Sequence, residues 1–184
     1  MRKLTHEELV AQRITAEQAL RVLRYPITLV LEDIRSLYNV GSIFRSVDAF
    51  CVEWLVLSGY TPQPPRKEIS KTALGADATV PWTYVASTVD AIVQLKAEGV
   101  RVFAVELAES SLTLAALSSM LLASPHAHIA LVLGNELTGV SAPVMGLCEG
   151  AVEIPMFGTK HSLNVAVAAG IVLHALVASL PARS

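Results

Sequence analysis

Aromatic residues, charged residues and cysteines are all scarce in this chain of 184 residues. Aromatic residues make up 5% and charged residues 16%, whereas hydrophobic residues make up 53%. A core must therefore be built mainly from Ala, Val, Leu and Ile. The mean hydropathy is high for a small soluble chain, which cannot bury that much apolar surface by itself. We therefore expect a buried subunit interface.

The sequence also lacks the features of secreted and metal-binding proteins. Cys51 and Cys148 lie far apart and fit neither a CxxC pair nor a metal site, so we expect two reduced core thiols. No cluster of Cys, His or carboxylate residues has the spacing of metal ligands, so no metal is expected. Residues 1–13 carry charges throughout and contain no apolar run typical of a signal peptide. These features predict a cytoplasmic protein.

One long apolar stretch, residues 162–180, has the composition of a buried helix rather than of a membrane span. It is rich in Ala, opens with Ser162, Leu163 and Asn164, and contains His174. We therefore expect no membrane association.

Phosphate-binding glycine motifs are absent, because the chain has neither a GxxxxGK[ST] nor a GxGxxG segment. Nucleotide phosphates are therefore not the expected ligand. The charge is uneven: residues 1–71 hold ten Lys and Arg against eight acids, whereas residues 72–184 hold four against eight. A net charge of −2 argues against a protein that coats nucleic acid, but local RNA contacts would come mainly from the first part.

After Pro26, short apolar runs alternate with helical patterns. Runs rich in β-branched residues predict buried strands within residues 27–33, 53–59, 78–85, 100–107, 128–135 and 150–156. Helical patterns cover residues 40–50, 87–99 and 111–121 and resume after Thr138. This alternation predicts an α/β fold with a parallel sheet flanked by helices on both faces.

The N-terminal residues predict a short helical arm. Thr5 and Thr15 are suited to cap helices at 6–13 and 16–24. No Pro-, Gly- or Ser-rich linker separates two cores, so we expect a single domain over residues 1–184, with the arm at 1–25 and the core at 26–184.

Ligands of parallel α/β sheets bind in loops beyond the carboxyl ends of the strands, and three such loops are unusual here. The first follows Asp33 and leads into a helix that contains Asn39 and Arg45. Neither residue needs a functional role: Asn39 could cap the helix, and Arg45 could be an ordinary solvated arginine. If Arg45 points into the cleft, its planar fork suits a phosphate.

The other two loops follow Leu133 and Ile154. In the segment GNELTG, Gly134 and Gly139 would let backbone groups approach a ligand closely. In the third loop Ser162 is a candidate helix cap, and Asn164 needs a partner, because an unpaired amide in so apolar a helix would be destabilising. His161 beside Ser162 does not indicate a hydrolase, since adjacent side chains seldom face each other and no orienting carboxylate follows from the spacing.

Taken in order, the segments NVGSIFRS, LVLGNELTGV and IPMFGTKHSLNVAVA resemble the three motifs of the SpoU (TrmH-like) branch of the SPOUT RNA methyltransferases. The resemblance extends from Ile27 to the last helix, and KTALGA at Lys71–Ala76 is similar to a further family segment. It implies an α/β fold with a deep C-terminal trefoil knot, a homodimer, and S-adenosyl-L-methionine bound in the knot. One position departs from the family pattern, because Ala166 stands where relatives often have a serine.

The activity implied by the resemblance is methylation of a ribose 2′-hydroxyl in tRNA or rRNA, with S-adenosyl-L-homocysteine as product and no metal. The implied cofactor-binding residues are Leu133, Gly134, Ile154, Met156, Leu163 and Asn164. The implied catalytic group is Asn39, Arg45, Glu136, Ser162 and Asn164, with Arg45 facing the RNA. Basic residues of an exposed Pro-rich segment are further candidates for contacts with RNA phosphates, a solvated loop being the alternative: Arg66, Lys67 and Lys71.

Methyl transfer requires the 2′-oxygen in line with the sulfonium methyl group, so positioning lowers much of the barrier. The family mechanism lets the arginine accept the hydroxyl proton, but a guanidinium hardly ever loses its own proton in proteins. We expect Arg45 instead to hold the adjacent phosphate and to stabilise developing alkoxide charge, while the phosphate or a water accepts the proton.

Two alternative functions fit the same fold. The first is a catalytically silent RNA-binding dimer, which would be free to lose some of the polar residues of the implied catalytic group. Arg45, Glu136, Ser162 and Asn164 are all present, which argues against it. The second is a SPOUT enzyme that methylates a base nitrogen. The motifs of such enzymes generally differ from the order found here, NVGSIFR followed by SLNV.

Overall fold

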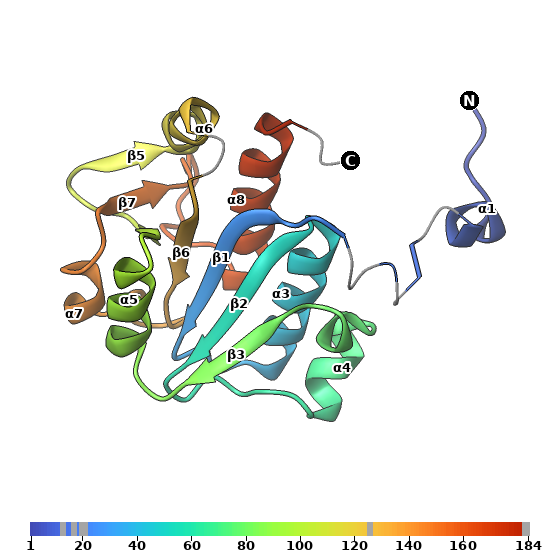
Figure 1. Cartoon of the computed structure of the whole chain (residues 1–184), viewed down its shortest axis with the longest axis horizontal. Coiled ribbons are helices and arrows are strands. Elements are labelled where there is room, and N and C mark those ends of the chain that lie inside the picture. The colour runs from blue at the N-terminus through green and yellow to red at the C-terminus, as the bar shows by residue number, and fades with distance from the viewer. Residues whose placement is uncertain (12–13, 16–17, 19–21, 125–126, 182–184) are drawn as a thin grey trace.

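A computed structural model describes residues 1–11, 14–15, 18, 22–124 and 127–181. Seven strands form one sheet in the order β3-β2-β1-β6-β4-β7-β5 (Figure 1). Their bounds are β1 Tyr25–Glu32, β2 Val52–Ser58, β3 Trp82–Val85, β4 Arg101–Val105, β5 Ser111–Thr113, β6 Ile129–Leu133 and β7 Gly150–Glu153. All pairings between neighbouring strands are parallel, which confirms the expected α/β sheet.

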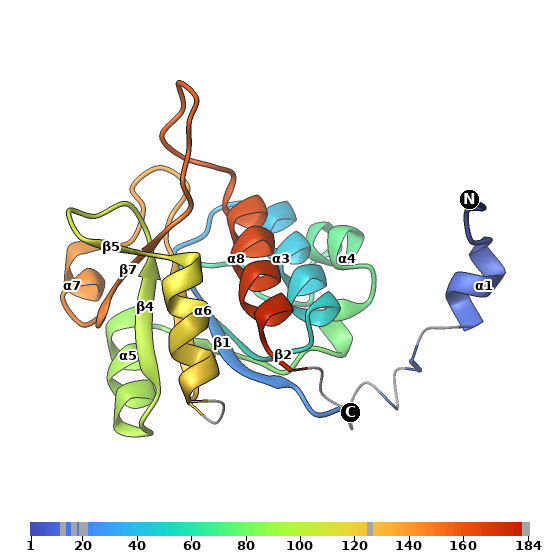
Figure 2. The same cartoon turned by 90° about the horizontal axis from the view of Figure 1, so that it is seen from above.

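Helices cover both faces of the sheet. The helices that the structure describes are α1 His6–Ala11, which lies apart from the sheet, and α3 Leu37–Ala49, α4 Lys67–Ala73, α5 Thr88–Ala97, α6 Leu114–Ala123, α7 Ala142–Met145 and α8 Val165–Ser179, with a 3-10 turn η1 at Ala76–Ala78. Figure 2 shows α4, α3, α8 and α6 side by side on one face, where they share one hydrophobic core with that side of β1 and β2. On the other face α5 and α7 pack over a second, smaller core.

The two central strands explain why the loops converge. β6 is fully buried, β1 is buried at nearly every residue, and their apolar runs are those expected for strands covered on both faces. β6 lies between β1 and β4, although residues 33–128 separate β1 from β6 in the chain. The carboxyl ends of β1, β4, β6 and β7 therefore meet at one edge, and the loops that follow them gather there.

The structure corrects several local predictions. Residues 111–113, expected as the start of a helix, form β5 against β7, and the helix begins after Thr113, whose side chain caps it. The Pro-rich segment 61–71 was expected to be an exposed loop, but Thr61 is buried and α4 begins at Lys67, with Ile69 and Ala73 buried on one side. Such a short helix after a proline run gives too little periodicity to predict. The free cysteines, Cys51 and Cys148, are partly buried rather than core residues.

The cap predicted at Thr5 is confirmed at the start of α1, and Thr15 makes hydrogen bonds of the same kind. Thr5 accepts from the amide of Glu8 at 3.3 Å and Glu8 accepts from the amide of Thr5 at 2.7 Å; Thr15 and Gln18 form the same reciprocal pair. The second predicted helix, at 16–24, lies largely outside the described residues, and residues 22–24 are not helical. α1 stands apart from the sheet in Figures 1 and 2.

Within the described ranges, no helix has the length and apolar character needed to cross a bilayer. The most apolar one, α8, contains 15 residues.

Candidate functional site

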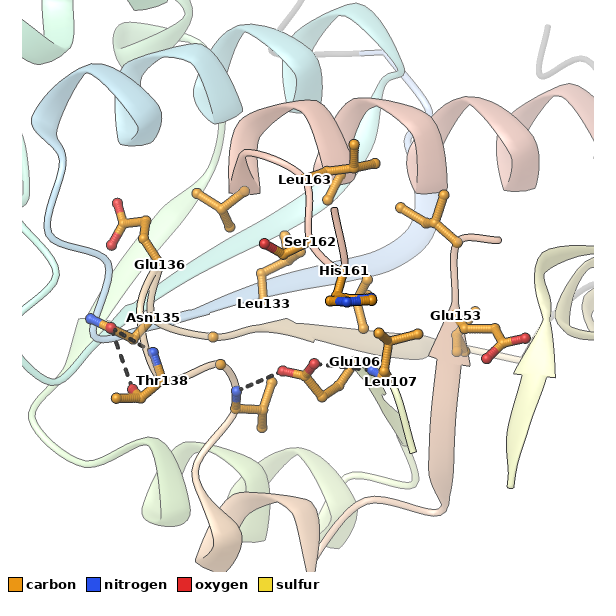
Figure 3. A pocket seen from close by; sticks show the side chains of 18 of the residues that line it. Glu106, Leu107, Leu133, Asn135, Glu136, Thr138, Glu153, His161, Ser162 and Leu163 are labelled. Carbon is orange, nitrogen blue, oxygen red and sulfur yellow. Dashed lines mark hydrogen bonds between the residues drawn. The ribbon is translucent and has the colours of Figure 1, made fainter. Parts of the chain in front are cut away.

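A cavity of about 640 Å³ opens where β4, β6 and β7 end (Figure 3). Three segments, at 105–107, 133–140 and 152–163, supply most of its lining, and α7 and α8 supply the rest. Three of the described lining residues are glutamates, Glu106, Glu136 and Glu153, and none is lysine or arginine. A ligand of this cavity therefore has to tolerate, or benefit from, a negative electrostatic potential.

The loop after β6 folds tightly against itself. Asn135 and Gly139 exchange backbone hydrogen bonds of 3.1 and 2.9 Å. A side chain at Gly134 would collide with the backbone of Gly139 and Val140. Gly139 has a φ of +68° and abuts the Glu106 carboxylate. Both glycines are therefore required for the close packing of this loop against itself and against Glu106, and the predicted approach to a ligand stays a prediction.

Asn135 holds this loop to its neighbours and is only 7% exposed. Its Oδ1 accepts from the amides of Leu137 and Thr138 at 2.9 and 3.2 Å. Its Nδ2 donates to the Asp33 carbonyl and to the Tyr60 hydroxyl, both at 2.7 Å. The loops after β1, β2 and β6 are thus joined through one buried amide.

Next to Asn135, three polar residues form a chain of hydrogen bonds, named here the polar chain: Glu136 of the loop after β6, Asn39 of the first turn of α3, and Asn164 at the start of α8. Asn39 Nδ2 donates to Glu136 Oε1 at 3.0 Å, and Asn164 Nδ2 donates to Asn39 Oδ1 at 3.0 Å. Asn164 Oδ1 accepts from the amides of Ala166 and Val167, at the start of α8. The predicted need of Asn164 for a partner is confirmed, and its partners are both backbone and side chain.

Glu136 is held ionised by its neighbours. Burial raises the pKa of its carboxyl, but hydrogen bonds from the Arg35 amide, Asn39 Nδ2 and the Ser36 amide outweigh it and leave the pKa below its ordinary value. The ionised Glu136 carboxyl therefore stabilises the folded state fully at pH values above the pKa that it has in the unfolded chain. This stabilisation is lost as the pH falls through the lower pKa of Glu136 in the folded state.

Helix capping in the site differs from the predictions. Ser36, not Asn39, caps α3, through a hydrogen bond from the Asn39 amide to Ser36 Oγ. Asn164, not Ser162, caps α8. Because Ser36 satisfies the helix end, the side chain of Asn39 is free to bridge Glu136 and Asn164.

Five of the six predicted cofactor residues line the cavity: Leu133, Gly134, Ile154, Met156 and Leu163. The sixth, Asn164, is not among the lining residues but lies between Leu163 and Val165, which are. The predicted catalytic residues Glu136 and Ser162 line it as well. Ser162 is exposed, has no side-chain hydrogen bond to any described residue, and lies toward the cavity beside His161 in Figure 3.

Arg45 is not part of this cluster within one chain. It lies six residues beyond Asn39 on α3, about 9 Å further along the axis and roughly a third of a turn around it. Its side chain is exposed and makes no hydrogen bond or ion pair with the described residues. The structure therefore brings together Asn39, Glu136, Asn164 and Ser162, but leaves Arg45 projecting to solvent.

The predicted RNA-contacting residues Arg66, Lys67 and Lys71 are exposed at the start and along one side of α4. α4 is held against α3 by close contact at Gly41, where a side chain would collide with α4. The basic residues thus occupy a fixed position on the face that also carries α3.

Glu106, which was not predicted to be a site residue, lines the cavity just beyond the end of β4. Its carboxylate accepts from the amides of Val140 and Leu107 at 3.1 and 3.0 Å. One signal was available, because it is a charged residue near the carboxyl end of the apolar run 100–107, which was predicted as a parallel strand. Among the described residues, no group of three metal-ligating side chains occurs here or elsewhere.

Comparison with known proteins gives a consistent family assignment. The 23S rRNA (guanosine-2′-O-)-methyltransferase RlmB of Neisseria meningitidis is 32% identical over 149 residues, which cover 80% of this chain and 56% of that protein. The chain thus spans little more than half the length of this relative. The tRNA (guanosine(18)-2′-O)-methyltransferase of Thermus thermophilus is 31% identical over 170 residues, covering 91% of this chain and 82% of that enzyme.

Solved structures share the fold. An AdoMet-bound rRNA methyltransferase from Sinorhizobium meliloti superimposes with a TM-score of 0.76 and 26% identity, covering 89% of this chain and 61% of that chain. The TrmH/SpoU tRNA modifying enzyme of A. aeolicus has a TM-score of 0.75 at 24% identity, covering 90% and 84%. A sequence profile described as the SpoU rRNA Methylase family matches residues 26–174. Since this match spans most of the chain, the chain belongs to the SpoU rRNA Methylase family.

Proposed function

We propose that this chain binds S-adenosyl-L-methionine in the cavity and methylates a ribose 2′-hydroxyl in tRNA or rRNA. The observation that carries the proposal is the position of the polar chain Glu136–Asn39–Asn164 at the cavity, with Glu136 in its lining. The relatives from Neisseria and Thermus are named as guanosine 2′-O-methyltransferases of 23S rRNA and tRNA, which supports the same reaction here.

The residues that line the cavity fit this cofactor. S-adenosyl-L-methionine carries a sulfonium and an ammonium against one carboxylate, so its net charge is positive and three lining glutamates favour it. The apolar side chains of Leu133, Ile154 and Leu163 suit an adenine ring. The AdoMet-bound relative from Sinorhizobium meliloti supports the same ligand.

Bound there, the cofactor would supply a methyl group on a positively charged sulfur. Asn39 and Asn164 lie where amide groups can orient a ribose, and Glu136 fixes Asn39 from behind. Ser162 has a hydroxyl available for a further hydrogen bond. Holding these groups in one geometry before the substrate arrives is the protein's main contribution to the rate.

We infer that Arg45 acts on the site of the partner subunit in a homodimer. Arg45 is displaced from its own polar chain and free of described partners. α8 packs beside α3 and exposes an apolar stripe of Val167, 51% exposed, and Ile171, 37% exposed. If a second copy covers this stripe, its α3 approaches the same site. Arg45 would then hold an RNA phosphate and stabilise alkoxide charge, while that phosphate or a water takes the proton.

The finer features of the family assignment are part of the same proposal. A C-terminal trefoil knot is supported by the sheet order, in which β6 and β7 insert next to β4, and by the contacts of α8 with both α3 and α6. We also propose one domain over residues 1–184, with an arm at 1–25, a cytoplasmic location and activity without a metal.

Isothermal titration calorimetry tests the cofactor assignment. We expect S-adenosyl-L-methionine and S-adenosyl-L-homocysteine to bind with affinities unchanged by EDTA. ATP, the matched control with the same adenosine, should not bind, because the described lining offers no cation to its phosphates. A folded dimer that binds neither adenosyl ligand but still binds RNA would instead be the silent RNA-binding protein.

A further inference from the structure

Tyr60 is an exposed aromatic residue whose two ends are fixed. It follows Gly59 in the loop after β2, and its side chain is 60% exposed. Its hydroxyl accepts from Asn135 Nδ2 at 2.7 Å, and its amide donates to Asp33 Oδ1 at 2.9 Å. A ring held at its backbone and at its tip, but open to solvent, is pre-organised for a partner outside the chain.

The loop that carries Tyr60 is held on both sides. Tyr84, at the end of β3, donates its hydroxyl to the Gly59 carbonyl at 2.8 Å. Gly59 has a φ of +62°, and a side chain there would collide with the Asp33 carboxylate. The position of the Tyr60 ring is therefore set by β1, β3 and the loop after β6 together.

The ring lies close to the polar chain. Its hydroxyl is hydrogen-bonded to Asn135, which immediately precedes Glu136 of the polar chain. The α-carbons of Asn135 and Glu136 are therefore about 3.8 Å apart. Figure 3 shows Asn135 and Glu136 projecting from the same turn at one end of the cavity. Asp33, which binds the Tyr60 amide, precedes the turn whose amides at Arg35 and Ser36 donate to Glu136.

The surroundings of Tyr60 favour a nucleic acid as its partner. Arg35 is exposed beside the polar chain, and Tyr38 is an exposed aromatic residue on the first turn of α3. α4, which carries Lys67 and Lys71, is attached at this same turn, because Thr72 Oγ1 donates to the Tyr38 carbonyl at 3.0 Å. Aromatic rings interleaved with cations are the usual means by which proteins hold unpaired nucleotides.

We propose that Tyr60 is a stacking platform for an unpaired base of the substrate RNA, next to the nucleotide that enters the polar chain. The inference rests on the proposed function, because that function makes RNA the substrate. Through Asn135, the platform is fixed relative to the loop 134–139 that lines the cavity, so a stacked base would place its neighbouring ribose in register with the methyl donor.

Two substitutions separate stacking from loop support. Tyr60→Phe keeps the ring and removes the hydroxyl, whereas Tyr60→Leu removes the π-face. We expect Tyr60→Leu to weaken binding of bulk tRNA and of a mixed-sequence single-stranded RNA by about tenfold, and Tyr60→Phe to stay within about threefold of the wild type. Trp54→Leu is the matched control, since Trp54 is a 41% exposed aromatic residue on the preceding strand, away from the cavity lining.

The affinity for S-adenosyl-L-homocysteine, measured on the same preparations, distinguishes the possible results. Stacking predicts unchanged cofactor affinity in all three variants. The proposal is overturned if Tyr60→Leu binds RNA like the wild type, or if both Tyr60 variants lose RNA and cofactor affinity together. A wild type that binds RNA through Tyr60 but transfers no methyl group would support the platform and refute the proposed function.

Discussion

Arg45→Ala is expected to lower methyl transfer to RNA on the order of 100- to 1,000-fold, the usual effect of removing a group that stabilises developing oxyanion charge. Its affinity for S-adenosyl-L-methionine should stay close to that of the wild type, because Arg45 does not line the cavity. Calorimetry with the cofactor, and incorporation of labelled methyl groups into total RNA, measure the two effects separately.

Arg45→Lys is the matched control for charge. It keeps the cation but loses the planar fork that binds a phosphate with two parallel hydrogen bonds, so we expect most of the activity to be lost as well. Nearly full activity in Arg45→Lys would mean that charge alone is sufficient. Loss of cofactor binding in Arg45→Ala would contradict the division of roles between α3 and the cavity.

Two inactive variants should restore activity when they form a heterodimer. We expect Asn39→Ala to be inactive because it breaks the polar chain between Glu136 and Asn164. If Arg45 serves the partner's site, a heterodimer of Arg45→Ala and Asn39→Ala contains one complete site. It should therefore reach about half the wild-type rate per dimer.

Co-expression of the two variants with different tags, followed by two affinity steps, isolates the heterodimer. Its methyl-transfer rate is compared with that of each variant alone. If Arg45 acts in its own chain, neither site of the heterodimer is complete and the rate stays at the level of the single variants. Failure to recover any doubly tagged protein, with only monomers in sedimentation, would contradict the proposed homodimer.

The sheet and the three loops were predictable because they depend on local patterns. The largely apolar run of β1 and the fully apolar run of β6 identify strands buried on both faces, and polar residues after such strands lie at the ligand-binding edge. The predicted parallel α/β fold and the SpoU assignment are both confirmed. Short elements without such patterns, β5 and α4, were not predicted.

The contacts within the site were not predictable from local patterns. The Asn39–Asn164 hydrogen bond joins residues 125 positions apart, and it depends on β6 lying between β1 and β4. The same strand order brings Glu106 against the loop at Val140. The direction of Arg45 depends on where α3 begins, and that is set by Ser36 rather than by Asn39. Each of these features follows from the tertiary arrangement and not from the motif that contains the residue.

The most direct test of the proposed activity is the chemical position of the transferred methyl group. RNA is labelled by the wild-type protein with methyl-labelled S-adenosyl-L-methionine and then hydrolysed in alkali, which cleaves RNA only next to a free 2′-hydroxyl. We predict that the label is recovered in alkali-resistant dinucleotides, because a 2′-O-methyl group blocks cleavage. Label recovered only in mononucleotides would place the methyl group on a base and contradict ribose methylation.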